Sequence, residues 1–437
     1  MLKNSFFYYI KIFGCQINYV DAERITKTLT ASSGKKVNNA SEADLIVVLS
    51  CGVRQGAEER IIHWIQKTKK EHKKAKIILT GCLSHRKAIK TLLKKVLYCS
   101  LPIDKWTTAF SAFNKDFYEI IPDHSSNYRA YIPIMNGCNN FCAYCVVPFA
   151  RGREISRMPE SILEEIKVAL KRGVKEIYLL GQNVASFKKK DRKGKTWTFP
   201  RLLTKIDNLP GKFWIRFVST HPKDVNAQFI KAFGEGKKIS SNLHLPVQAG
   251  SNRILGKMNR KYSREKYLAN VKAVRKARPK TVFSSDIIVG FPGETARDFQ
   301  DSVDIVKKSQ FEMLYSLKYS PRPGTAAYAW KDNVPAATKK FRQQALDKTW
   351  EKIALKKNQQ FLGKKIVILI DKIKLKEGQG GERQYHALGK NFENKDVSAI
   401  ITSSKKHGIV GKWGIVKINK VGSLGMSGEL VKVKKDL

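Results

Sequence analysis

Residues 137–148, GCNNFCAYCVVP, hold three of the seven cysteines of this 437-residue chain, at Cys138, Cys142 and Cys145. The spacing C-x3-C-x2-C supplies three soft thiolates in one short loop, and soft sulfur ligands select zinc, copper(I) or an iron–sulfur cluster. A closed zinc site needs a fourth ligand, yet no C-x2-C or His-x3-5-His pair lies within the next 60 residues. A 4Fe-4S cluster held by three cysteines leaves one iron open to a small molecule. Three cysteines without a fourth ligand nearby are consistent with such a cluster.

The three cysteines also have an alternative interpretation as buried core residues, because positions i, i+4 and i+7 share one face of a helix. Gly137, Asn139 and Asn140 favour a loop over a helix start. Three adjacent thiols without a metal would also be prone to oxidation. The sequence therefore favours a metal-binding loop.

The stretch 137–148 resembles the cluster loop of radical S-adenosylmethionine (SAM) enzymes, and more narrowly that of the methylthiotransferases. The continuation through RGRE at 151–154 to SR at 156–157 strengthens the resemblance. In that superfamily the open iron chelates the amino and carboxylate groups of SAM. The resemblance thus implies that the three cysteines of this loop hold the SAM-binding 4Fe-4S cluster.

The chain is strongly basic, with 83 Lys and Arg against 37 Asp and Glu and a net charge of +46. Such an excess favours a polyanionic partner such as nucleic acid. Most of the excess is lysine spread along the whole chain, and a lysine-rich source composition would produce the same pattern. The charge supports a nucleic-acid partner without establishing one.

The sequence favours a cytoplasmic protein without membrane contact. No apolar run approaches the roughly 18 residues of a membrane span. Lys11 introduces a charge before a signal-peptide core is complete. Clustered cysteines in such a chain fit metal thiolates in a reducing compartment better than disulfides.

Residues 1–123 alternate strand and helix patterns, which predicts βαβ units and a Rossmann-like parallel sheet. Cys15, Cys51 and Cys82 each come just after the end of an expected strand. Parallel strands place their carboxyl ends along one edge, where such sheets bind ligands, so the three thiols are expected to converge. The alternative is that they are buried strand-end thiols. The expected strands are 6–13, 44–49 and 76–80, and the expected helices are 21–30 and 57–71.

The segments GCQIN at 14–18 and GCL at 81–83 resemble the amino-terminal domain of the methylthiotransferases, whose three cysteines hold a second, auxiliary 4Fe-4S cluster. The family usually has Asn-Thr before the middle cysteine, where this chain has LS at 49–50. This departure puts the hydrogen bonding around Cys51 in doubt. Cys99 has no comparable placement and is expected to be structural.

Residues 124–356 repeat a strand–helix unit six times, which predicts a partial (β/α)6 barrel with its chemistry at the carboxyl ends of the strands. Polar or glycine-rich segments occur there and predict a pocket for SAM. The expected strands are 130–135, 176–180, 214–219, 242–247, 281–289 and 313–319, and the clearest helices are 159–171, 264–278 and 296–309.

Four of these segments resemble segments of the family: LGQNV at 180–184, LPVQAGS at 245–251, SDIIVGFPGET at 285–295 and YSPRPGT at 319–325. No role is assigned to His221 or His244, because satisfied structural histidines are commoner than bases. The residues expected to contact SAM are Gly181, Gln182, Asn183 and Gln248.

Residues 357–437 contain short β runs with turns rich in Gly, Asn and Lys, which predicts a small antiparallel β-barrel. A lysine-rich helix at 338–357 is expected to link this domain to the barrel. Position and pattern resemble the TRAM module, by which several RNA-modifying enzymes hold tRNA. The expected strands are 366–370, 385–388, 398–402, 414–418 and 430–433.

Together the resemblances imply a methylthiotransferase, which converts an unreactive C–H bond into C–S–CH3 and needs a radical to do so. VVPFARG at 146–152 and GQN at 181–183 look most like tRNA-2-methylthio-N6-dimethylallyladenosine synthases, which modify carbon 2 of N6-isopentenyladenosine beside the anticodon. The implied cofactors are two 4Fe-4S clusters and SAM. The implied partners are a tRNA anticodon stem-loop and an electron donor such as flavodoxin or ferredoxin, and the protein is expected to be a monomer.

Alternative functions remain open from the sequence. Within the family, the methylthio acceptor is instead threonylcarbamoyladenosine in tRNA or an aspartate of a ribosomal protein. Outside it, the chain is a non-enzymatic iron–sulfur protein that binds RNA or transfers electrons. That last alternative predicts two clusters and no cleavage of SAM.

Overall fold

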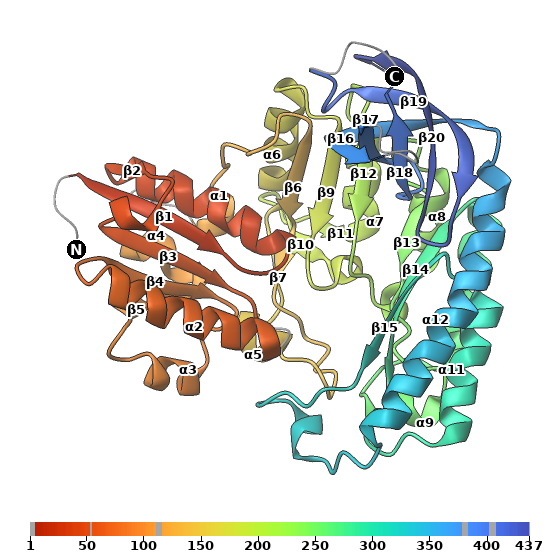
Figure 1. Ribbon diagram of the computed structural model, residues 1–437, viewed down its shortest axis with the longest axis horizontal. Helices are drawn as coiled ribbons and strands as arrows, with labels where there is room; N and C mark the ends of the chain where they lie inside the picture. Colours follow the sequence, from red (N-terminus) through yellow and green to blue (C-terminus); the bar gives the residue numbers. More distant parts are fainter. Residues whose placement is uncertain (1–4, 53–54, 111–115, 378–382, 402–407, 437) are drawn as a thin grey trace.

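The computed structural model describes residues 5–52, 55–110, 116–377, 383–401 and 408–436. Figure 1 shows a sheet flanked by helices in red and orange, a central barrel of strands and helices, and a small carboxyl-terminal barrel in blue. The central barrel contacts both of the other parts, and buried charges take part in both contacts.

The amino-terminal part is a parallel sheet, as expected from its sequence. Its strand order is β2-β1-β3-β4-β5, and the neighbouring strands run parallel. Strand β3 is buried at every position, which explains why its first five residues, LIVVL, are all apolar. The strands are β1 Phe6–Ile12, β2 Gly34–Lys36, β3 Leu45–Ser50, β4 Lys76–Gly81 and β5 Cys99–Ser100, and the helices are α1 Gln16–Ala31, α2 Gln55–Glu71, α3 Lys87–Leu92 and α4 Trp106–Ala109.

Helix α1 begins at Gln16, five residues before the expected start at 21, with Cys15 as its N-cap residue. The additional turn carries Ile17 and Val20, which pack in one cluster with Tyr178 and Leu180 of the central barrel. Tertiary packing that is absent from the local sequence pattern therefore sets this helix boundary.

The central part is the expected open parallel barrel. Strands β12-β9-β6 and β13-β14-β15 form two parallel three-stranded sheets, and an isolated parallel bridge joins Ile215 to Ile239 between them. The barrel strands are β6 Arg129–Pro133, β9 Glu176–Leu180, β12 Trp214–Phe217, β13 Asn242–His244, β14 Val282–Val289 and β15 Met313–Lys318.

Helices cover the outside of this barrel, and two short antiparallel pairs extend from it. The pairs are β7 Met135–Asn136 with β8 Ile155–Ser156, and β10 Lys188–Lys190 with β11 Thr196–Thr198. The helices are α5 Val147–Arg151, α6 Pro159–Lys171, α7 Phe199–Asp207, α8 Ala227–Glu235, α9 Asn252–Lys257, α10 Arg264–Ala277, α11 Ala296–Ser309 and α12 Ala336–Asn358.

Helix α12 links the central barrel to the carboxyl-terminal part, as expected, and it also packs in the core of the central barrel. Leu346, Trp350 and Ala354, spaced by four residues, are buried in the core cluster of the barrel. Its many lysines conceal this apolar stripe in the sequence. Among the described residues, no helix combines the length and apolar character that a membrane span needs.

The carboxyl-terminal part is a closed five-stranded barrel of order β16-β17-β18-β20-β19. It differs from the expected antiparallel barrel in one pair, because β18 and β20 run parallel. The strands are β16 Lys365–Glu377, β17 Arg383–Asn391, β18 Asp396–Ile400, β19 Trp413–Val421 and β20 Gly425–Lys434.

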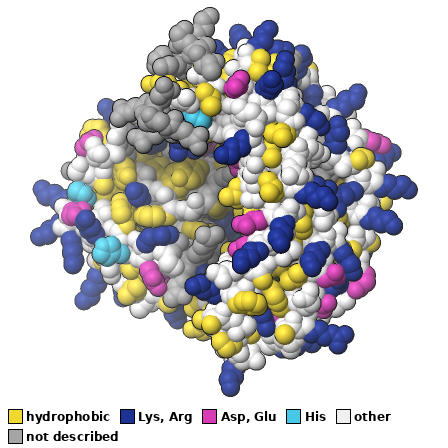
Figure 2. All heavy atoms as spheres, turned by 45° about the vertical axis from the view of Figure 1, so that its right-hand side comes forward, with side chains coloured by type: hydrophobic (Ala, Val, Ile, Leu, Met, Phe, Trp, Pro, Cys, Tyr) yellow, Lys and Arg dark blue, Asp and Glu magenta, His cyan; other side chains and the backbone are white. Residues whose placement is uncertain are grey.

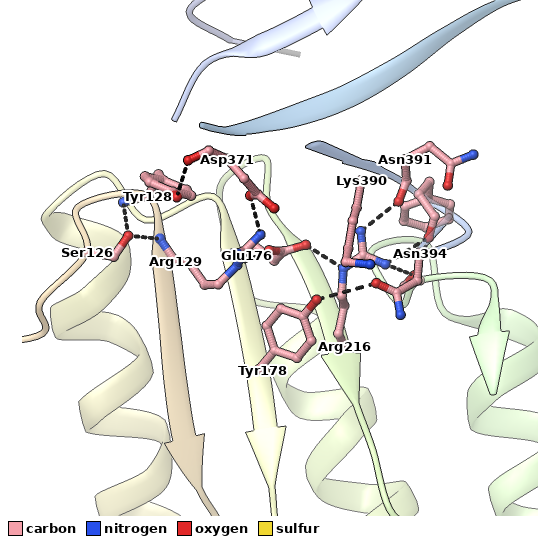
Figure 3. A network of polar contacts seen from close by, with 12 residues as sticks. Ser126, Tyr128, Arg129, Glu176, Tyr178, Arg216, Asp371, Lys390, Asn391 and Asn394 are labelled. Carbon is pink, nitrogen blue, oxygen red and sulfur yellow. Dashed lines mark hydrogen bonds and ion pairs between the residues drawn. The ribbon is translucent and has the colours of Figure 1, made fainter. Parts of the chain in front are cut away.

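The carboxyl-terminal barrel packs on the amino ends of the central strands. Figure 3 shows Arg129, Glu176 and Arg216, from the starts of β6, β9 and β12, meeting Asp371 and Asn391. Glu176 pairs with both arginines, Arg129 Nη2 lies 2.6 Å from Asp371 Oδ1, and Arg216 Nη2 donates to the Asn391 carbonyl at 2.7 Å. The carboxyl ends of the central strands are left uncovered by this barrel.

A second group of buried charges fixes the amino-terminal part against the central barrel. Arg24 of α1 lies 2.6 Å from Glu165 of α6, and Arg157 lies 2.7 Å from the other oxygen of the same carboxylate. Burial alone would raise the pKa of Glu165, but the two guanidinium groups outweigh it and lower this pKa. The charged carboxylate is thus the form that holds the two parts together.

Replacing Glu176 by Gln will destabilise the protein, because Arg129 and Arg216 then lose their shared carboxylate in a buried interface. We expect a loss of about 3–5 kcal/mol, measured by calorimetric or denaturant unfolding. Asp123→Asn removes the exposed pairs with Lys27 and Arg172 and serves as the control, with an expected loss below about 1 kcal/mol. Equal losses in the two variants would contradict a stabilising role for the Glu176 network.

Acid will weaken the contact made by Glu165. Its pKa lies below the ordinary value of 4.5, so its contribution to stability is complete above that value and is lost as pH falls through the lowered pKa. We expect the difference in unfolding free energy between the wild type and Glu165→Gln to shrink over this range. A difference that stays constant down to acidic pH would show that the carboxylate charge does not matter.

Candidate active site

Cys15, Cys51 and Cys82 follow three adjacent parallel strands, β1, β3 and β4, and the structure brings their loops together at one sheet edge. A Cβ atom placed on Gly14 would lie 2.7 Å from Cβ of Cys51, and one on Gly52 would lie 3.3 Å from Cβ of Cys82. Gly14 also has φ +124°, which a larger residue would adopt only with strain. These three cysteines are called the sheet-edge trio below.

Two side chains hold the loops of the sheet-edge trio. Nδ2 of Asn18 donates to the carbonyl of Phe13 at 2.6 Å and to that of Ser50 at 3.1 Å. The Ser50 hydroxyl donates to the Thr80 carbonyl and accepts from the backbone N–H of Leu83. Ser50, which stands where the family usually has Thr, therefore fixes the turn that carries Cys82.

Cys138, Cys142 and Cys145, the loop trio, lie in an irregular segment between β7 and α5. The alternative that places them on one helix face is wrong, since Phe141 has φ +47° in the middle of the segment. Nδ2 of Asn140 donates to Sγ of Cys138 at 3.4 Å.

The loop is clamped from two sides. The N–H of Cys138 donates to the Gly152 carbonyl at 3.2 Å, where the chain returns after α5. Nδ2 of Asn259, which follows α9, donates to the Phe141 carbonyl at 2.8 Å. Gly137 has φ +77°, and a Cβ atom there would lie 2.1 Å from the Arg153 carbonyl oxygen, so only glycine fits.

Arg260 is a residue of this site that the sequence does not indicate. Its buried guanidinium donates to Sγ of Cys142 at 3.3 Å and to the Pro246 carbonyl at 3.0 Å. Burial alone would lower its pKa, but Tyr144, Tyr262 and Cys142 raise it, so the charge is retained beside the thiol. The 83 lysines and arginines of the chain give this one no distinguishing signal.

Two thiols of the loop trio, Cys138 and Cys145, are proton-bound in the metal-free protein. Burial raises the pKa of Cys138, and it raises the pKa of Cys145 to about 12. A metal that binds there must displace these protons. Among the described residues, no three His, Cys, Asp or Glu side chains converge to hold one metal ion. Three soft sulfur donors without a fourth protein ligand suit a cluster with an open position.

The residues expected to contact SAM lie at the carboxyl ends of two barrel strands. Gly181 and Gln182 follow β9, and Oε1 of Gln182 is buried without a hydrogen-bond partner among the described residues. Gln248, with φ +71°, forms a parallel bridge with Ile287. Asn183 is already engaged, because Nδ2 donates to Asp224 at 2.6 Å and Oδ1 accepts the N–H of His221 at 3.0 Å.

The two histidines differ in their surroundings. Nδ1 of His221 accepts the N–H of Lys223 at 3.2 Å, and burial, with Arg260 and Lys223 nearby, lowers its pKa to about 2. His221 is therefore uncharged. Nδ1 of His244 lies 2.9 Å from the Ser284 hydroxyl.

Arg151 connects the surroundings of the two trios. It is the last residue of α5, and it donates to Oδ1 of Asn18 at 2.9 Å and to Oδ1 of Asn136 at 3.1 Å, and pairs with Asp21 at 3.1 Å. Burial alone would lower the pKa of Arg151, but Asp21, Cys82, Tyr118 and Cys15 raise it. The guanidinium thus lies within electrostatic reach of the sheet-edge trio.

A cavity of about 480 Å³ adjoins Arg151. Residues next to both trios line it, since Gly81 directly precedes Cys82 and the Gly152 carbonyl accepts the N–H of Cys138. Aromatic and basic side chains share its wall, among them Phe117, Phe149, Arg153 and Lys189. The cavity thus adjoins the segments that carry both trios.

Comparison with known families places this site in context. Residues 132–306 match the model of the radical SAM superfamily, and residues 7–101 match the uncharacterized protein family UPF0004. The first match covers the loop trio and the expected SAM residues, and the second covers the sheet-edge trio.

Curated relatives match nearly the whole chain. The tRNA-2-methylthio-N(6)-dimethylallyladenosine synthase of Thermoanaerobacter pseudethanolicus is 36% identical over 98% of this chain and 93% of its own. The enzyme of that name from Clostridium novyi is 35% identical over 97% and 96%. The one from Caldicellulosiruptor saccharolyticus is 40% identical over 83% and 82%.

Among solved structures, a radical S-adenosylmethionine methyltransferase, TsrM, from Kitasatospora setae has a similar fold. The TM-score is 0.56 at 12% identity, over 74% of this chain and 77% of that one. At this identity the likeness concerns the fold alone.

Gly137→Ala will disturb the loop trio more than Gly152→Ala. Both glycines have φ near +76°, but only Gly137 faces a backbone atom, while a Cβ atom on Gly152 would meet nothing within 4 Å. The left-handed backbone costs each alanine variant about 1–2 kcal/mol, and the clash adds to this at Gly137. Thermal unfolding of the two variants measures the difference, and equal losses would contradict the crowding at Gly137.

Proposed function

The chain belongs to the tRNA-2-methylthio-N(6)-dimethylallyladenosine synthase family of the radical SAM superfamily, and we propose that it adds a methylthio group to carbon 2 of N6-isopentenyladenosine beside the anticodon of tRNA. It is a tRNA methylthiotransferase, and its cofactors are 4Fe-4S clusters and SAM. Relatives of this name match over nearly the full length of the chain, which supports the choice of this acceptor over threonylcarbamoyladenosine or a ribosomal protein aspartate.

The observation that carries the proposal is the set of contacts of Arg151, which donates to Asn18 beside the sheet-edge trio and to Asn136 beside the loop trio, and which lines one cavity. We assign the cluster that binds SAM to Cys138, Cys142 and Cys145. We assign the auxiliary cluster to the sheet-edge trio, Cys15, Cys51 and Cys82. A reaction that needs both clusters requires them to lie near a common space, and the cavity beside Arg151, lined by Gly81 and Gly152, supports this placement.

The reaction must break a C–H bond on a carbon with no acidic proton and no leaving group, and the bound clusters and SAM supply the radical and sulfur chemistry. Asn140 and Arg260 each donate to a thiol of the loop trio and so stabilise thiolate charge. Arg151 holds Asn18, whose amide fixes the loops of the sheet-edge trio.

We further assign SAM binding to Gly181, Gln182, Asn183 and Gln248. The buried acceptor of Gln182 lacks a partner among the described residues and suits a donor such as the SAM amino group. Asn183 is engaged with Asp224, so its contribution is to position the segment as well as to bind.

The proposed division of the chain is a methylthiotransferase domain at 1–123, a radical SAM domain at 124–356 and a TRAM-like RNA-binding domain at 357–437. Lys and Arg side chains are spread over the face shown in Figure 2, where Asp and Glu are few. This distribution favours tRNA as the polyanionic partner.

We also propose an electron donor such as flavodoxin or ferredoxin, a monomeric state and a cytoplasmic location. The location follows because clustered thiols require a reducing compartment.

The function is tested by mass spectrometry of tRNA nucleosides from cells with and without this gene. We expect the 2-methylthio-isopentenyl nucleoside to disappear in the deletion and to return with the wild-type gene. Its persistence would overturn the acceptor, and loss of the threonylcarbamoyl product instead would identify the alternative one. Deoxyadenosine formed from SAM after reduction with dithionite separates the enzyme from a non-enzymatic iron–sulfur protein.

The cluster assignment is tested by iron content. We expect the triple variant Cys138→Ala, Cys142→Ala, Cys145→Ala to retain about half of the wild-type iron after anaerobic reconstitution, because the other trio still holds its cluster. The same is expected when Cys15, Cys51 and Cys82 are replaced together. Cys99→Ala, the control, should retain all the iron, and a loss in this variant would contradict the assignment.

A further inference from the structure

The hairpin formed by β10 and β11 is far more basic than the rest of the chain. Within 188–195 it carries six cationic residues against a single acid, Asp191. With 83 Lys and Arg in 437 residues, the chain-wide composition predicts about one or two cations in any eight. A lysine-rich source composition therefore does not account for this segment. The cations are Lys188, Lys189, Lys190, Arg192, Lys193 and Lys195.

These cations have no carboxylate partner of their own. Five of the six are exposed, and none forms an ion pair within the described part of the chain. The one acid serves the turn, since Asp191 accepts the N–H groups of Lys193 and Lys195 and the indole N–H of Trp197 at 2.8–3.0 Å. The positive charge of the hairpin is therefore available to attract a negatively charged partner outside the chain.

Hydrogen bonds fix the hairpin to segments that lie next to the loop trio in the fold. The N–H of Lys188 donates to the Ser156 hydroxyl at 3.2 Å, and the N–H of Arg192 donates to Glu160 at 2.9 Å. Ser156 belongs to β8, which pairs with β7 directly before the loop trio. The cations thus have a defined position relative to the loop trio.

The hairpin also borders the cavity beside Arg151. Lys189 lines this cavity together with Phe149 and Ile155, whose side chains are 54% and 66% exposed. Exposed aromatic and apolar surface beside unpaired cations is the combination that binds single-stranded nucleic acid, with bases on the apolar groups and phosphates on the cations.

The carboxyl-terminal barrel does not provide this contact. It packs on the amino ends of β6, β9 and β12 (Figure 1), whereas the cavity is lined by residues such as Asn136 and Lys189, which follow the carboxyl ends of β6 and β9. A tRNA held by that barrel alone would be fixed at the opposite end of the central strands from the reacting groups. Placing one base in the cavity requires a second contact beside it.

We propose that hairpin β10–β11 binds the backbone phosphates of the tRNA anticodon arm and so holds the target base at the cavity. This inference rests on the proposed function, because it takes tRNA as the substrate. It adds a site of RNA contact, built from the six cations named above, that is separate from the carboxyl-terminal barrel. The hairpin takes no part in the chemistry.

The test uses the full-length protein and a fluorescent anticodon stem-loop that contains N6-isopentenyladenosine. The variant replaces Lys188, Lys190, Lys193 and Lys195 by Gln, and anisotropy is measured over a series of salt concentrations. We expect affinity to fall by about tenfold or more near 0.15 M salt, and the slope of log K against log salt to become shallower by about 0.7–0.9 for each lost phosphate contact. The lysines are exposed, so folding is retained, and the unfolding temperature verifies this.

The control removes the same charge from the outer face of the barrel, with Lys266, Lys272, Lys276 and Lys280 replaced by Gln. These residues are exposed on and just after α10. We expect a much smaller change in affinity and an unchanged salt slope. Equal effects in the two variants, or none, would overturn the proposal for the hairpin.

Two further outcomes are distinguishable. If the wild type itself fails to bind the stem-loop, both this inference and the proposed function are overturned. If the hairpin variant binds RNA as the control does but is reduced more slowly by flavodoxin, the surface docks an acidic protein, and the proposal of an RNA contact is overturned.

Discussion

The contact between the amino-terminal sheet and the central barrel determines whether this protein has a site, because each part carries only one trio of cysteines. Buried charges make that contact: Glu165 with Arg24 and Arg157, and Asp21 with Arg151. Removing one member of a buried pair leaves an uncompensated charge, so these contacts specify a single arrangement of the two parts. A few apolar side chains, Ile17 and Val20 against Tyr178 and Leu180, complete the interface.

Local chain geometry then brings each trio together. The sheet-edge trio converges because three adjacent parallel strands end at one edge, and small residues such as Gly14 let the loops approach each other. The loop trio is shaped by contacts on both sides, from Gly152 and from Asn259. Strand ends position the first trio, whereas two distant segments position the second.

Much of this could be predicted from the sequence. Alternating strands and helices indicated the parallel sheet and the open barrel, and the places of all six cysteines at strand ends or in a loop followed from the same pattern. What escaped prediction depends on contacts between distant segments. Arg260 meets Cys142 from 118 positions away, and α12 conceals Trp350 of the barrel core among lysines. The hairpin of β10 and β11 was not expected as strands, because a run of lysines has no apolar alternation.

The docking of the carboxyl-terminal barrel on the amino ends of the central strands sets a minimum size for any molecule that touches both ends of the enzyme. Strand β9 has five residues, and at about 3.3 Å per residue it separates its two ends by about 16 Å. A free nucleoside is too short to bridge this span, while a folded arm of tRNA is long enough. The length of the barrel strands thus sets the distance that a molecule must span to contact both ends, whatever its base sequence.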